Sequence, residues 1–121
     1  MEFLALEETI ADTHDDYTPW GECVAGFADN KNFVVRYCLE NYEKDYEILE
    51  DAVMKPGEAY ELAKRMKVHV IDLPKALAEE FGVERDTLTS SEAYEVFEDV
   101  RAFLLENHVR FRMVRKKKNR S

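Results

Sequence analysis

The stretch from residue 12 to residue 16 reads DTHDD and holds the side chains best suited to chemistry. Asp12, His14, Asp15 and Asp16 offer one imidazole and three carboxylates. Such groups can ligate a divalent cation, and a histidine beside a carboxylate can act as a general base. However, no second histidine or glutamate follows at helical spacing, and aspartates are common in loops because they stabilise turns. We therefore predict no metal site and no cofactor, and keep a small metal-dependent enzyme that uses the 12–16 loop as an alternative.

The other candidate groups do not form a catalytic set. Cys23 and Cys38 lie within β-rich runs, where a free cysteine is usually a small core residue, and no neighbouring cation lowers the pKa of either thiol. His69 and His108 are isolated. The sequence has no GxGxxG, Walker, GxSxG or HExxH motif, and its 4 glycines are too few to suggest a phosphate-binding loop. We predict that the protein is not an enzyme.

Charge is distributed unevenly along the chain. Residues 1 to 109 contain 10 basic and 26 acidic residues, a charge of −16, whereas the last twelve residues carry +7. The acidic part repels nucleic acid over a Debye length of about 8 to 10 Å, and the basic run has no aromatic side chain for base stacking. We expect Arg110 and Arg112 to pair with acidic neighbours across a sheet and residues 116–121 to be a basic disordered tail. A nucleic-acid-associated regulatory module that uses this tail remains an alternative function.

Acidic residues and tyrosines occur together in the segments EETIADTHDD and ENYEKDYEILED. Tyrosines are enriched in protein interfaces, and charge complementarity raises association rates and specificity. We therefore predict a non-enzymatic small acidic interaction protein that binds a basic protein partner, as an inhibitor or immunity-type protein does. The residues predicted to contact the partner are Asp15, Asp16, Tyr42, Glu43, Asp45, Tyr46 and Glu47.

A hairpin is the clearest element in the sequence. The β-rich runs GECVAGFA and NFVVRYCLE flank the loop DNK. A three-residue loop pairs Phe27 with Phe33 and Cys23 with Tyr37, which makes one face wholly apolar. Since a slip of one residue turns every side chain over, burial favours this register. It places Cys23 and Cys38 on opposite faces, so they cannot form a disulfide.

The remaining elements follow from hydrophobic periodicity and capping signals. Alternation predicts strands over residues 2–10, 44–52 and 109–114. An apolar stripe at helical spacing predicts a first helix after KPGE. Asp72 and Gly82 bound a second helix, while Thr89 and Glu92 form a capping box for a third helix that ends at Asn107.

These elements predict an α+β fold, with an antiparallel sheet of four to five strands and three helices inserted before the C-terminal strand. We expect a single α+β domain over residues 1–115. No apolar run approaches the ~20 residues of a membrane helix, and the start MEFLALEETI differs from a signal peptide. We therefore expect a cytoplasmic protein that does not associate with membranes. The sequence does not decide between a monomer and a homodimer.

Overall fold

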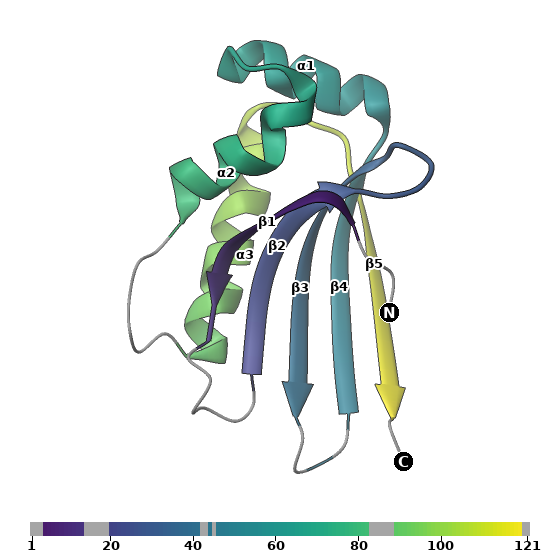
Figure 1. The fold of residues 1–121 in the computed structure, drawn as a ribbon, viewed down its shortest axis with the longest axis vertical. Coiled ribbons are helices and arrows are strands. Elements are labelled where there is room, and N and C mark those ends of the chain that lie inside the picture. The colour runs from purple at the N-terminus through teal and green to yellow at the C-terminus, as the bar shows by residue number, and fades with distance from the viewer. Residues whose placement is uncertain (1–3, 14–19, 42–43, 45, 83–88, 120–121) are drawn as a thin grey trace.

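The protein folds as one five-stranded antiparallel sheet with helices on one side (Figure 1). The computed structural model describes residues 4–13, 20–41, 44, 46–82 and 89–119. The strands are β1 (Ala5–Asp12), β2 (Trp20–Phe27), β3 (Phe33–Asn41), β4 (Tyr46–Met54) and β5 (Arg112–Asn119), in that spatial order. The helices are α1 (Pro56–Met66), α2 (Leu73–Phe81) and α3 (Ser90–Glu106), with a short 3-10 turn η1 (Val70–Asp72) before α2. The predicted α+β class is confirmed, including three helices before the last strand.

The β2–β3 hairpin has the predicted register. Phe27 pairs with Phe33 and Cys23 pairs with Tyr37. The Ala28 and Lys31 amides donate hydrogen bonds of 2.9 Å that close the three-residue loop, and Lys31 takes a left-handed φ of 68°. This is the usual geometry of a three-residue hairpin.

The two faces of the sheet have different surroundings. The face that carries Cys23, Val35, Tyr37 and Ala52 packs against α2 and α3 and forms the main core, and we call it the helix face. The opposite face carries Glu22, Arg36, Cys38, Glu40, Glu47 and Asp51, and we call it the helix-free face. Helix α1 lies across one end of the sheet (Figure 1).

Local signals explain where the helices begin and end. Thr89 and Glu92 form the predicted capping box, in which the Glu92 amide donates to the Thr89 hydroxyl at 3.2 Å. The same helix ends at Asn107, and α2 ends at Gly82, both as predicted. Each C-cap amide donates to a carbonyl of the last turn, which satisfies part of the unpaired helix end.

Strand β1 is irregular where the sequence predicts a simple alternation over 2–10. Its pairing with β2 shifts register between Ala5 and Glu8 and again between Thr9 and Ala11. Within the first shift Leu6 adopts a φ of 54°, a left-handed conformation that costs a residue with a side chain roughly 1–2 kcal/mol. Bulges of this kind re-aim side chains at the edge of a sheet.

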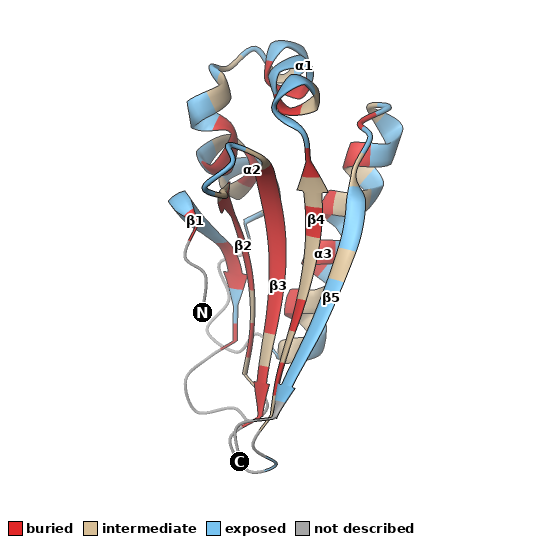
Figure 2. Cartoon of the chain, turned by 90° about the vertical axis from the view of Figure 1, so that its right-hand side faces the viewer, coloured by how far each residue is buried: buried red, intermediate tan, exposed pale blue. Residues whose placement is uncertain are grey.

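Strand β5 extends beyond the predicted 109–114. Lys116 to Asn119 pair with Leu49 to Tyr46 of β4, so the prediction of a disordered tail is wrong for residues 116–119. Figure 2 shows this strand exposed along most of its length, in contrast to the buried β3. Cross-strand charge accounts for the longer pairing of β5 with β4. The Arg115 guanidinium lies 3.5 Å from the Glu50 carboxylate, and Lys118 stands opposite Glu47.

Within the part of the chain that the structure describes, no helix has the length and apolar character to cross a membrane.

Ending the chain after Arg115 should lower the melting temperature, because it removes the pairing of residues 116–119 with β4. We expect a loss of roughly 1–2 kcal/mol in the free energy of unfolding, measured by thermal and urea denaturation. A matched truncation that removes only residues 120 and 121 should have little effect. Equal stability of both truncated chains would contradict a structural role for the end of β5.

Candidate functional site

The residues predicted to contact a partner are only partly within the described chain. Tyr46 and Glu47 open β4 and, as successive strand residues, point to opposite faces. The Tyr46 ring is half-buried beneath the ammonium of Lys117, 5.3 Å from the ring centre, whereas Glu47 is buried on the helix-free face. The residues that lie outside the described ranges are His14, Asp15, Asp16, Tyr42, Glu43 and Asp45.

Four carboxylates gather at the end of the helix-free face that is remote from α1. Asp12 of β1 stands opposite Glu22 of β2, and Glu40 of β3 stands opposite Glu47 of β4. We call Asp12, Glu22, Glu40 and Glu47 the acidic cluster. Like charges on directly opposed strand positions destabilise a sheet. Asp12 is exposed and Glu22 is half-buried, whereas Glu40 and Glu47 are 6% and 7% exposed.

The carboxyl group of Glu22 has a raised pKa. Burial first, and then the nearby carboxylates of Glu7, Asp12 and Glu40, together raise its pKa from the ordinary value of 4.5 to about 7. Near neutral pH this group is therefore divided between its protonated and ionised forms.

Cys38 lies beside the acidic cluster and directly opposite Glu22. Its thiol lies 3.6 Å from a carboxylate oxygen of Glu47 and 4.0 Å from one of Glu40, to which it can donate. Burial and these two carboxylates raise the pKa of Cys38 to about 12. At neutral pH the thiol is protonated, which makes it a weak nucleophile.

The thiol of Cys38 and the carboxylates of Glu40 and Glu47 could together hold a metal ion. One ligand atom from each lies within 4.8 Å of the others. Thiolate and carboxylate groups are ligands for Zn²⁺, which would have to displace the thiol proton. Sequence reasoning missed this group. The spacing Cys-x-Glu in a strand does place two side chains on one face, but Glu47 joins them only through the β3–β4 register.

On the helix-free face, an ion pair lies next to the acidic cluster, toward the middle of the sheet. The Arg36 guanidinium donates two hydrogen bonds to the Asp51 carboxylate, at 2.7 and 3.0 Å, from directly opposed positions on β3 and β4. The side chains are 8% and 15% exposed. Breaking such a shielded pair by removing one member is usually strongly destabilising.

Two tyrosines that could have anchored a partner serve the core instead. The Tyr37 hydroxyl donates to the Ser90 carbonyl and the Tyr94 hydroxyl donates to Glu50, both at 2.9 Å. Burial raises the pKa of both groups above the ordinary value. These contacts attach α3 to the helix face.

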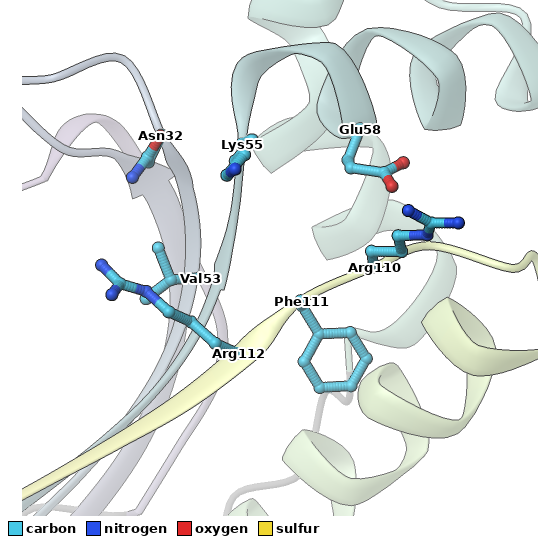
Figure 3. Close-up of a pocket in the computed structure, with 7 residues that line it drawn as sticks. All are labelled: Asn32, Val53, Lys55, Glu58, Arg110, Phe111 and Arg112. Carbon is cyan, nitrogen blue, oxygen red and sulfur yellow. The ribbon is translucent and has the colours of Figure 1, made fainter.

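A basic hollow of about 480 Å³ lies where the chain enters β5 (Figure 3). Its lining consists of Asn32, Val53, Lys55, Glu58, Arg110, Phe111 and Arg112. The prediction that Arg110 and Arg112 pair with acidic strand neighbours is wrong, because Arg110 precedes the strand and Arg112 stands opposite Val53. In Figure 3 the Glu58 carboxylate points toward Arg110.

Comparison with known proteins gives no relative, since no protein-family model, curated protein or solved structure matches this chain.

Replacing Glu22 with Gln should change how stability depends on pH. Because folding raises the pKa of Glu22 from 4.5 to about 7, the folded protein binds this proton more tightly than the unfolded chain does. The free energy of unfolding should therefore fall as pH rises from about 4.5 to 7. The variant should lose this slope and be more stable at pH 8 by roughly 1 kcal/mol, a figure that allows for the partial exposure of Glu22.

Urea denaturation at several pH values measures the effect. Glu98, which is exposed on α3, provides a matched control as Glu98→Gln. A Glu22→Gln variant whose pH profile follows that of the wild type would contradict the shifted pKa.

Proposed function

We propose that this chain is a non-enzymatic interaction protein that binds a basic protein partner at the acidic cluster, as an inhibitor or immunity-type protein. The observation that supports this most directly is the opposition of Asp12 to Glu22 and of Glu40 to Glu47. The fold keeps two like-charged strand pairs at one end of the sheet, although Glu47 also stands opposite Lys118 of β5. Positions that break a local stability rule in this way are expected at functional sites.

The arrangement of the acidic cluster suits a lysine or arginine side chain. Asp12 and Glu22 are accessible, and the buried carboxylates of Glu40 and Glu47 add to the negative potential on the same face. A cation that approaches Glu22 favours its ionised form, which lowers its pKa and releases a proton. Binding should therefore strengthen as pH rises from about 6 to 8.

Asp15, Asp16, Glu43 and Asp45 stay predicted contact residues, but they lie outside the described ranges. Asp15 and Asp16 follow Asp12 closely in the sequence, and Glu43 and Asp45 precede Glu47. The tyrosine part of the prediction is weaker, because Tyr46 and Glu47 point to opposite faces.

A divalent cation is the second candidate occupant of this region, favoured by the mutual approach of Cys38, Glu40 and Glu47. Cation binding would deprotonate the Cys38 thiol and give a thermal shift that Cys38→Ser abolishes. A basic protein needs no such deprotonation, so the same substitution should leave its binding unchanged.

An affinity pull-down from the native cell extract tests the proposed function. Immobilised wild-type protein should retain a basic partner, and the double variant Asp12→Asn with Glu22→Gln should lose it by about tenfold or more. The control is Glu98→Gln with Asp99→Asn, which removes the same formal charge from the exposed side of α3.

Equal losses in the two double variants would mean that net charge, rather than the acidic cluster, drives retention. A partner retained undiminished by the Asp12 and Glu22 variant would refute the proposed surface. A partner whose binding does not strengthen between pH 6 and 8 would contradict the role given to Glu22.

A further inference from the structure

An apolar groove lies at the α1 end of the sheet, opposite the end that holds the acidic cluster. A hollow of about 600 Å³ is lined by Ala5, Leu6, Phe27, Ala28, Lys31, Pro56, Gly57, Ala59, Tyr60, Val70 and Ile71. A second hollow of about 420 Å³ shares Tyr60, Val70 and Ile71 with it. We call the two together the α1 groove.

The rim of the α1 groove exposes large apolar side chains. Leu6 is 60% exposed, Tyr60 is 56% exposed and Ile71 is 62% exposed. Among the described residues these are three of the five large hydrophobic side chains that are exposed, and the other two, Leu105 and Met113, do not line the groove. A gathering of exposed apolar groups around a hollow is typical of a binding site, whereas scattered single residues are not.

Backbone strain at Leu6 supports the same conclusion. The residue combines a left-handed φ of 54° with an exposed fraction of 60%. Burial in the core therefore does not explain why a leucine occupies this position. Strained backbone of this kind is concentrated at functional sites.

The charge around the α1 groove indicates the kind of occupant. The groove is lined by Lys31, Lys64 and His69 but by no Asp or Glu. The basic hollow in Figure 3 is adjacent, because Asn32 and Lys55 of its lining are the sequence neighbours of Lys31 and Pro56. It adds Lys55, Arg110 and Arg112 against the single carboxylate of Glu58. Although the chain has a net charge of −9, the linings of these hollows carry more basic than acidic side chains.

We propose that the α1 groove binds an apolar segment of a partner protein whose anchoring side chains are flanked by acidic residues. The two hollows accept two anchors, as in grooves that bind amphipathic helices. The acidic flanks face Lys31, Lys64 and the cations of the basic hollow. This site is independent of the acidic cluster, so one protein could join a basic partner and an acidic one.

Two labelled peptides test the inference, both with two leucines one helical turn apart. One peptide carries glutamates at its other positions, and the other carries lysines there. Fluorescence anisotropy should show binding of the glutamate peptide at least about tenfold tighter than that of the lysine peptide. NMR amide shifts should map the glutamate peptide to Leu6, Tyr60 and Ile71.

Matched substitutions separate the groove from general stickiness. Ile71→Asp should weaken binding of the glutamate peptide about tenfold, whereas Leu105→Asp, at a position of equal exposure (63%) on α3, should change it less than about twofold. Lys55→Glu with Arg110→Glu should reverse the preference toward the lysine peptide, and Lys75→Glu on α2 should not.

Leu6→Asn distinguishes a binding role from a structural one. Asn tolerates the left-handed conformation better than Leu does, so the melting temperature should be kept or raised while peptide binding falls. A variant that loses stability and binding together would contradict the inference. Equal binding of the two peptides, or NMR shifts that map to another surface, would also contradict it. Self-association that Ile71→Asp abolishes would contradict it as well, because the occupant would then be a second copy of the chain.

Discussion

The register between β2 and β3 is the constraint on which the rest of the structure depends. The three-residue loop sets Phe27 against Phe33 and Cys23 against Tyr37, and these apolar positions then face α2 and α3. The alternate positions, including Glu22, Arg36 and Glu40, must take the other face. A slip of one residue would place Arg36 and the glutamates in the core against the helices. The free-energy penalty for burying these charges would destabilise the fold. The acidic cluster is thus a geometric consequence of burying the aromatic side of the hairpin.

Cross-strand charge also accounts for the pairing of the last strand, β5, with β4. β4 presents carboxylates on both faces, with Glu50 on the helix face and Glu47 and Asp51 on the other. β5 places basic side chains next to these carboxylates, with Arg115 beside Glu50 and Lys118 opposite Glu47. The strongly basic end of the chain and its acidic body therefore belong to one structure, since the last strand partly neutralises its neighbour. Its exposed lysines also protect the sheet edge from pairing with other chains.

The sequence predicted those features that depend on local chemistry and on burial. The hairpin register, the Thr89 capping box and the helix ends at Gly82 and Asn107 all follow from loop length, periodicity or capping residues. The end of β5 was missed because RKKKNRS contains no apolar alternation, and its strand pairing depends on the carboxylates of β4. The left-handed Leu6 has no sequence signature, because leucine is a poor residue for that conformation. The spacing of Cys38 and Glu40 in one strand places these two side chains on the same face. That Glu47 lies close to them could not be predicted without the register between β3 and β4. Of the predicted contact surface, Glu47 belongs to the acidic cluster, while Tyr46 points away from it.

The central claim is that burial and neighbouring carboxylates hold Glu22 half-protonated, and that the acidic cluster to which it belongs attracts a basic partner. The most direct measurement is an NMR pH titration of the Glu22 carboxyl carbon, carried out with and without a lysine-rich peptide. The account predicts a pKa near 7 for the protein alone, in agreement with its burial beside Glu7, Asp12 and Glu40. The pKa should fall when the peptide is added, because a bound cation favours the carboxylate. A pKa close to 4.5 in the protein alone, or one that the peptide leaves unchanged, would contradict the account.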